Sequence, residues 1–290
     1  MRQAVGMFRG IPVVDVHIHA ARHTTLKVDR PLWAMGLGDP TAFDRLYDGD
    51  GRVVPATFDA LLETDGIDVG LLMCEYSPKV TGIQPIEDNL ALVAHNPQRF
   101  RLLAALNPHY HYPVADELER QLGLGAVALK IHPVHAGCFA NDRALFPAYE
   151  LCRRRDIPVV VHCGTSVFPG AVNSFADPVH VDELTQHFPD VQWVLAHGGR
   201  GWWYDAAAFL AQSRSNVWLE LSGLPPRKLP EYYARHDLER LFKKAIFGTD
   251  WPGSPGFRHN VEGVASLGLS DDTLERVLWR NADAVYHLGL

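Results

Sequence analysis

The sequence has little cysteine, and its spacing would not build a site or a framework. The chain contains four cysteines and no C-x-x-C pair; they are Cys74, Cys138, Cys152 and Cys163. Closely spaced cysteine pairs are what zinc knuckles and small disulfide-rich folds need. Both classes are therefore excluded, and a reducing, cytoplasmic setting fits the chain best.

Long hydrophobic runs and an excess of positive charge are also missing. No apolar stretch approaches the roughly 18–20 residues of a membrane span, and no signal-peptide hydrophobic segment precedes the apolar run that begins at Ile11. The 27 basic and 34 acidic residues give a net charge of −7. Nucleic acids and anionic membranes require a basic surface instead. We expect a small-molecule substrate and no nucleic-acid or membrane partner, and we leave a homodimer open.

What the sequence does contain is a succession of short apolar, β-branched runs separated by helical patterns. Several runs are continuous rather than alternating, as expected for strands that are buried on both faces. The eight runs are 11–19, 68–76, 99–108, 125–133, 157–164, 191–199, 216–223 and 244–252. The clearest helical patterns between them are 86–96, 114–123, 142–155, 178–188 and 203–213.

Eight strands alternating with helices predict an α/β fold, a single (β/α)8 TIM barrel domain over residues 1–290. An open doubly wound sheet is the alternative, but no G-x-G-x-x-G motif follows the first strand. Residues 20–55 form a long insertion after strand one, rich in Gly, Asp and Pro. Insertions of this length are often functional, so we expect a lid over the active-site face.

The chain has 15 histidines, and several fall at the carboxyl ends of predicted strands, where barrel enzymes carry their catalytic residues. In the stretch VVDVHIHA, strand alternation places Asp15, His17 and His19 on one face. Later strand ends carry Lys130, His132, His162, His197, Ser222 and Asp250. A set of three histidines and one carboxylate drawn from these strand ends would suit Zn²⁺ or a similar divalent ion and would leave room for water or substrate.

Six motifs in order make the chain resemble the amidohydrolase superfamily. They are DVHIH, ALKIHP, VVVHCG, VLAHGG, ELSG and FGTDWP, within residues 13–252, and WRNADAVYHL at 279–288 is similar to a closing helix of the same group. The branch most resembled contains aminocarboxymuconate-semialdehyde decarboxylase and hydrolase-like relatives. The resemblance implies one divalent metal ion, Zn²⁺ first and Mn²⁺ second, and His197 as a nearby acid–base residue. The metal ligands it implies are His17, His19, His162 and Asp250.

Each ligand candidate has a structural alternative. His162 could be a hydrogen-bonded core histidine, and Asp250 in the sequence GTDWP could cap a turn. Asp15 lies one layer deeper in the barrel, and we expect it to orient a histidine. Cys163 follows His162 and should face the opposite way, so we expect it to pack in the core.

Lys130 has three interpretations. We expect it to bind substrate together with His132, which shares its strand face. In binuclear members of the superfamily a lysine near this position is carboxylated and bridges two metals, which is the first alternative. An ordinary ion-paired lysine is the second.

Aromatic residues and arginines gather near the predicted barrel mouth. Arg200, Trp202 and Trp251 closely follow His197 and Asp250 in sequence, and they would suit a planar or carboxylated substrate. The alternative is that the aromatic rings only cover the core. Trp33, Tyr76, Trp203 and Arg258 belong to the same group. No role is assigned to His23, His109, His111, His135, His180, His187, His236, His259 or His287.

This set of residues favours metal-dependent hydrolysis. The metal would lower the pKa of its bound water, Asp250 would accept a proton, and His197 would stabilise the developing oxyanion. The motifs AHGGRGWW and ALKIHP look more like the hydrolase-like relatives, so we favour a hydrolase acting on a small carboxylated, cyclic or aromatic substrate. Non-oxidative decarboxylation of an unsaturated or aromatic acid is the alternative. A non-catalytic metal protein is disfavoured, because the ligands come from distant strands and His197 is not needed as a ligand, which leaves it available for catalysis.

Overall fold

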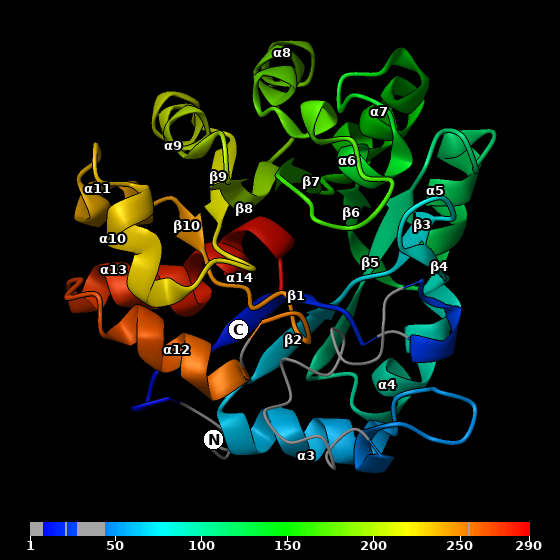
Figure 1. Cartoon of the computed structure of the whole chain (residues 1–290), viewed down its shortest axis with the longest axis horizontal. Coiled ribbons are helices and arrows are strands. Elements are labelled where there is room, and N and C mark those ends of the chain that lie inside the picture. Colours follow the sequence, from blue (N-terminus) through cyan, green and yellow to red (C-terminus); the bar gives the residue numbers. More distant parts are fainter. Residues whose placement is uncertain (1–7, 21, 28–43, 255) are drawn as a thin grey trace.

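The computed structural model describes residues 8–20, 22–27, 44–254 and 256–290. Its centre is an eight-stranded parallel sheet with the strand order β1-β2-β5-β6-β7-β8-β9-β10. The sheet curves into a barrel, and the connecting helices lie around its outside (Figure 1). The predicted TIM barrel is therefore confirmed.

The eight strands form where continuous apolar runs were found. Nearly all of their residues are buried, which is why valine, isoleucine and leucine dominate them. Their bounds are β1 Val14–Ile18, β2 Val69–Leu72, β5 Phe100–Leu106, β6 Ala126–Ile131, β7 Val159–Gly164, β8 Trp193–Arg200, β9 Val217–Glu220 and β10 Ala245–Ile246.

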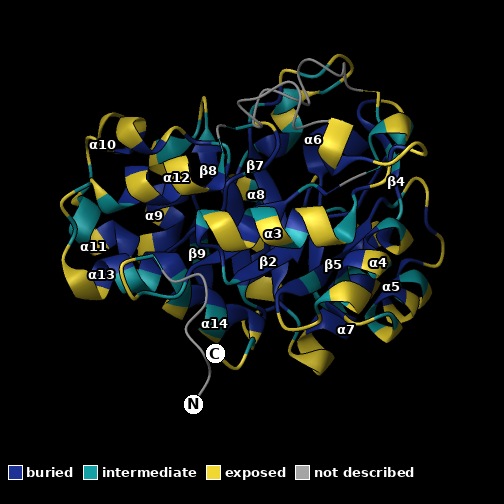
Figure 2. Cartoon of the chain, turned by 90° about the horizontal axis from the view of Figure 1, so that it is seen from below, coloured by how far each residue is buried: buried dark blue, intermediate teal, exposed yellow. Residues whose placement is uncertain are grey.

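The helices cover the sheet with one face and expose the other, as the yellow outer surfaces of α3 and α4 show (Figure 2). The five helical patterns read from the sequence correspond to α4, α5, α7, α8 and α9. The helices are α3 Pro55–Asp65, α4 Leu90–His95, α5 Val114–Gly123, α6 Pro133–Ala136, α7 Phe146–Arg155, α8 Val179–His187, α9 Tyr204–Ser213, α10 Leu229–Tyr232, α11 Leu238–Phe242, α12 Phe257–Ala265, α13 Asp271–Glu275 and α14 Asn281–Tyr286.

The sequence predicted that the second apolar run forms one strand as far as Tyr76, but the structure divides this run. Strand β2 ends at Leu72, and a separate antiparallel hairpin follows, formed by β3 (Glu75–Ser77) and β4 (Gly82–Gln84). The hairpin positions Glu75 at the carboxyl end of the barrel, where it lines a pocket together with His17 and Asp250.

The interior of the barrel is apolar at its base and polar at its carboxyl end. A separate apolar cluster joins inward-facing strand residues such as Ala128 and Val160 to Tyr286 of α14. Because strand side chains alternate in direction, Lys130 and His162 lie on the same faces as Ala128 and Val160, one step nearer the carboxyl end. The apolar base thus supports a layer of polar groups.

Backbone hydrogen bonds join the first strand to the last. Val16 N–H donates to Phe247 O at 3.2 Å, and His19 N–H donates to Trp251 O at 2.8 Å. Asp250 N–H donates to His17 O at 3.0 Å. The barrel therefore closes at the residues from which the predicted ligands project.

Part of the insertion after strand one packs on the β3–β4 hairpin. Leu26 pairs with Gly82, and Lys27 N–H donates to Thr81 O at 2.7 Å. Residues 21 and 28–43 of the predicted lid, including Trp33, lie outside the described residues. Among the helices described here, none is long and apolar enough to span a lipid bilayer.

Candidate metal centre

Three residues from distant parts of the chain form a group that could hold a metal ion. One ligand atom each from His17, His197 and Asp250 lies within 4.8 Å of the others. His17 Nε2 is 3.5 Å from Asp250 Oδ1, and His197 Nδ1 is 3.8 Å from Asp250 Oδ2. Ligand atoms about 2.1 Å from one ion are typically about 3.0–3.5 Å apart. The group is slightly wider than a closed coordination shell.

The orientation of His17 fits a metal ligand. Its Nδ1 lies 2.6 Å from Glu220 Oε1, so the carboxylate accepts a proton held on Nδ1. Its Nε2 is buried and has no hydrogen-bond partner among the described residues. Burial lowers the pKa of His17 well below 6.5, so the ring is neutral and Nε2 keeps its lone pair. An imidazole held by a carboxylate on one nitrogen with a free second nitrogen is a common arrangement at metal sites.

Sequence reasoning missed Glu220. It ends β9 in the motif ELSG, and burial raises its pKa to about 7, although the charge of Lys130 acts in the opposite direction. Ser222 Oγ also donates to Glu220 Oε1. The available signal was an acidic residue inside a buried apolar strand, which is rare without a partner.

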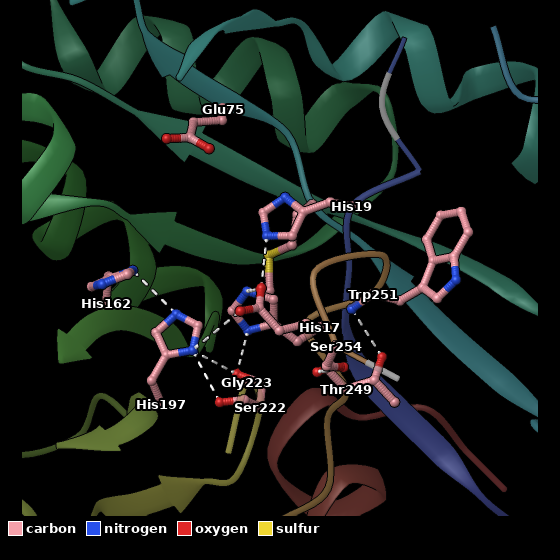
Figure 3. A network of polar contacts seen from close by, with 12 residues as sticks. His17, His19, Glu75, His162, His197, Ser222, Gly223, Thr249, Trp251 and Ser254 are labelled. Carbon is pink, nitrogen blue, oxygen red and sulfur yellow. Dashed lines mark hydrogen bonds and ion pairs between the residues drawn. The ribbon is translucent and has the colours of Figure 1, made fainter. Parts of the chain in front are cut away.

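Two of the grouped residues have unusual backbone conformations. His197 has φ of 65° and Asp250 has φ of 67°, in the left-handed region that non-glycine residues rarely adopt. Such conformations persist where surrounding contacts enforce them, and they concentrate at functional sites. Here they turn both side chains toward the space beside His17, as Figure 3 shows for His197.

Asp15 holds the turn that carries Asp250. Its Oδ2 accepts from Thr249 Oγ1 at 2.7 Å, and its Oδ1 accepts from the backbone N–H groups of Thr249 and His17, each at 3.0 Å. The sequence predicted that Asp15 orients a histidine. The structure shows that it fixes the backbone of His17 and of the neighbouring turn, and it contacts no imidazole ring by a hydrogen bond.

A hydrogen bond and a guanidinium stabilise the carboxylate of Asp250. Burial would raise the pKa of Asp250, but the hydrogen bond with His19 and the charge of Arg200 lower it below its usual range. Arg200 Nη1 is 3.6 Å from Asp250 Oδ2. Thr165 O accepts from Arg200 Nε at 3.2 Å and from Nη2 at 3.0 Å, which fixes the guanidinium beside the ligand group.

The other two predicted ligands also lie here. His19 Nε2 is 3.4 Å from Asp250 Oδ1. His162 Nδ1 is 3.1 Å from His197 Nε2, and His162 Nε2 is 3.0 Å from Gly164 O (Figure 3). His17, His19 and Asp250 thus approach one another directly, whereas His162 is connected to them through His197.

The ligand group lines an open pocket at the carboxyl end of the barrel. Lys130 is fully buried behind the pocket, and its Nζ has no hydrogen-bond partner among the described residues; burial lowers its pKa. His132 lines the pocket, and its buried Nε2 likewise lacks a partner in the described part of the chain. The opposite wall contains residues that sequence reasoning did not select: Glu75, Thr81, Gln84, His135 and Phe168.

The predicted substrate-binding aromatic residues do not line this pocket. Trp202 is 68% exposed, whereas Trp251 is 1% exposed and packs against Phe58 and Phe257 with ring centroids 4.9 and 5.6 Å apart. Figure 3 shows the Trp251 ring directed away from the histidines. Arg258 donates to Thr64 O of α3. Among the members of that group that the structure describes, Arg200 lines the pocket.

A family profile described as amidohydrolase matches residues 14–288. A search of curated proteins finds no match. The chain is similar in structure to an uncharacterised TIM-barrel protein from Bordetella bronchiseptica, with 20% identity, a TM-score of 0.76 and coverage of 96% of this chain and 99% of that one.

Several similar structures have named activities, and two of them serve as examples. One is 5-carboxyvanillate decarboxylase from Sphingomonas paucimobilis, with 17% identity, a TM-score of 0.65 and coverage of 96% and 99% of the two chains. The other is dihydroxybenzoic acid decarboxylase from Polaromonas, with bound manganese and the inhibitor 2-nitroresorcinol; identity is 18%, the TM-score 0.66 and coverage 97% and 98%. At these identities the likeness shows a shared fold.

Proposed function

This chain belongs to the amidohydrolase family, and we propose that it is a metal-dependent decarboxylase of an aromatic or unsaturated carboxylic acid. The observation that carries the proposal is the position of Arg200, whose Nη1 is 3.6 Å from Asp250 Oδ2 in the pocket that His17 also lines. A guanidinium next to a metal site is suited to bind a substrate carboxylate. The named decarboxylases among similar structures support this activity over the hydrolysis favoured by the sequence motifs.

One divalent ion would be held by His17, His19 and Asp250, with either His162 or His197 completing the set. Bound there, the ion would supply Lewis-acid polarisation of substrate oxygen atoms. Imidazole and carboxylate donors accept both Zn²⁺ and Mn²⁺, and a similar structure contains manganese. Both ions therefore belong in the test.

The protein groups provide binding and proton transfer. Arg200 holds the anionic end of the substrate, and Glu220 keeps His17 in the orientation that leaves Nε2 free. Loss of CO₂ requires a proton to be added to the carbon that carried it. Asp250 and His197 face the pocket within 3.8 Å of each other, and we assign this proton transfer to the pair.

The test is to incubate the protein, loaded with Mn²⁺ or Zn²⁺, with a panel of hydroxybenzoic acids in D₂O. We expect stoichiometric CO₂ and deuterium at the vacated carbon. Arg200→Met should raise KM by about 10-fold or more, as expected for losing a charged hydrogen bond. Arg258→Met is the matched control, since Arg258 contacts Thr64 on the outer helix α3.

Hydrolysis in the same site has a different isotopic signature. Incubation with esters or lactones in H₂¹⁸O would place ¹⁸O in a new carboxyl group without release of CO₂. That result, together with no CO₂ from any acid of the panel, would reject the decarboxylase and restore hydrolysis.

A further inference from the structure

A second carboxylate–imidazole pair lies in the pocket wall, and it leads to a serine. His135 Nδ1 is 2.7 Å from Glu75 Oε1, and His135 Nε2 is 2.9 Å from Ser166 Oγ. The three residues are 5–7% exposed: Glu75 5%, His135 7% and Ser166 7%. Figure 3 shows Glu75 set apart from His17 and His197. These residues come from β3, from α6 and from the loop that follows β7.

The order of the hydrogen bonds fixes the proton positions. Burial would raise the pKa of Glu75, but the hydrogen bond from His135 holds it well below its usual range, and Glu75 Oε1 also accepts from Thr81 Oγ1 at 2.5 Å. The carboxylate is therefore an acceptor, which places the proton of His135 on Nδ1. Nε2 is then the acceptor for the Ser166 hydroxyl. A hydroxyl bound to an imidazole that a carboxylate orients is the arrangement of an activated serine nucleophile.

Ser166 is placed where barrel enzymes carry reactive groups. It follows β7 at the carboxyl end of the barrel, and its backbone N–H donates to Asn173 Oδ1 at 2.7 Å. The two residues that contact its hydroxyl, His135 and Phe168, both line the pocket. The serine therefore lies directly behind the pocket surface.

A donor for a developing oxyanion lies beside the same imidazole. The ring of His132 is parallel to that of His135, with an interplanar angle of 7° and a centroid distance of 5.9 Å. Its Nε2 is buried without a hydrogen-bond partner in the described residues. Burial lowers the pKa of His132, so the ring is neutral. With its proton on Nε2, it offers a donor that the resting protein leaves unused.

We propose that Glu75, His135 and Ser166 form a second reactive centre, with Ser166 as the nucleophile toward small carboxylic esters. Ser166 Oγ forms a bond to the ester carbonyl carbon as its proton passes to His135 Nε2. The alcohol departs with that proton, and an acyl group remains on Ser166. Water then attacks the acyl carbon, gives one proton to His135, and the acid is released as this proton returns to Ser166. The sum is ester plus water giving acid plus alcohol.

This centre shares the pocket with the proposed metal site but uses different side chains. Both ring nitrogens of His135 are occupied by Glu75 and Ser166, and in the described chain the one group with metal-ligand spacing is His17, His197 and Asp250. The acyl transfer should therefore not need the ion. The acyl-transfer proposal is also independent of the decarboxylase proposal, so either one can fail while the other holds.

The experiment treats metal-stripped full-length protein with 4-nitrophenyl acetate and, separately, with a fluorophosphonate. With 4-nitrophenyl acetate we expect a burst of nitrophenolate followed by turnover that continues when a metal chelator is present. With the fluorophosphonate we expect a mass adduct that maps to Ser166. Ser166→Ala should lose adduct and burst, and His135→Asn should slow acylation by about 10²–10⁴-fold, the usual contribution of a general base. His132→Asn should slow acylation while sparing the Ser166–His135 contact.

Ser77→Ala is the matched control, because Ser77 is a buried serine on the strand that carries Glu75; it should react normally. If Ser166→Ala does not fold, Ser166→Cys provides the second measurement. Its thiol should be alkylated by iodoacetamide faster than the same thiol in the His135→Asn background. Absence of a Ser166 adduct, or equal alkylation rates in the two backgrounds, would reject the centre.

Discussion

His17 Nδ1 and Glu220 Oε1 lie 2.6 Å apart across the barrel, although 203 residues separate them in sequence. The contact determines which nitrogen of His17 holds the proton and which remains free for a metal. A carboxylate in this position also increases the basicity of the ligand. Glu220 would therefore support a metal ion indirectly, through the orientation of His17.

Replacing Glu220 by glutamine should weaken metal binding by about 10–100-fold while the barrel stays folded. Glutamine keeps the shape of the side chain but removes the negative charge that orients His17. Titration of the metal-free protein with Zn²⁺ and Mn²⁺ measures the change. Glu119→Gln, at an exposed ion pair with Arg155, is the control and should bind normally. Equal affinities in the two variants would contradict the role of Glu220.

Metal affinity should rise with pH through about 7, the value to which burial raises the pKa of Glu220. Below that pH the side chain is protonated and neutral, and above it the anion supports His17. His17 and His197 are not responsible, since burial lowers their pKa values well below 6.5. The measurement is metal Kd from pH 6 to 8, roughly one unit either side of the midpoint. If a Glu220→Gln variant keeps the full dependence of metal Kd on pH, another group is responsible for that dependence.

The purified protein should carry about one divalent ion per chain, and His17→Ala should abolish its retention. The alanine removes one of the four proposed donors, and the three that remain should hold the ion too weakly to survive purification. Elemental analysis counts the ion, and intact mass spectrometry checks Lys130. Two ions per chain with a carboxyl group added to Lys130 would establish a binuclear centre instead.

Gly223→Ala should remove metal binding by steric conflict. An alanine Cβ there would lie 2.6 Å from Asp250 Oδ2, 2.5 Å from Arg200 Nη1 and 3.3 Å from His197 Nδ1. Gly268→Ala is the matched control, because Gly268 also has positive φ and an added Cβ meets nothing within 4 Å. Both substitutions should cost about 1–2 kcal/mol of unfolding free energy for the left-handed backbone. Calorimetry and metal titration together should separate them, and normal metal affinity in Gly223→Ala would refute the steric argument.

The barrel could be predicted from sequence because its strands are buried on both faces and therefore appear as continuous apolar runs. The β3–β4 hairpin could not, since the apolar residues of β2 continue through Cys74 into Tyr76 and conceal the break. The pattern of apolar residues indicates which segments are buried, and both β2 and β3 are buried. It does not indicate where the backbone leaves the barrel sheet to form the hairpin.

The predicted ligands came together because strand ends meet at one edge of a barrel. Their supporting residues were missed for a physical reason: Glu220 and Glu75 act through pairings that no local pattern encodes. Trp251 was instead selected for the pocket although it does not line it. Its adjacency to Asp250 suggested the pocket, but the turn directs its ring into the core beside Phe58.

The hydrogen bonds from Asp250 N–H to His17 O and from His19 N–H to Trp251 O have a consequence for synthesis on the ribosome. They place the first and the last strand of the barrel at the same site. A nascent chain that has emerged only as far as His197 holds its histidines without the aspartate or the closing strand. The proposed metal-dependent reaction would therefore have to wait until the turn at Asp250 has left the ribosome and the barrel is nearly complete.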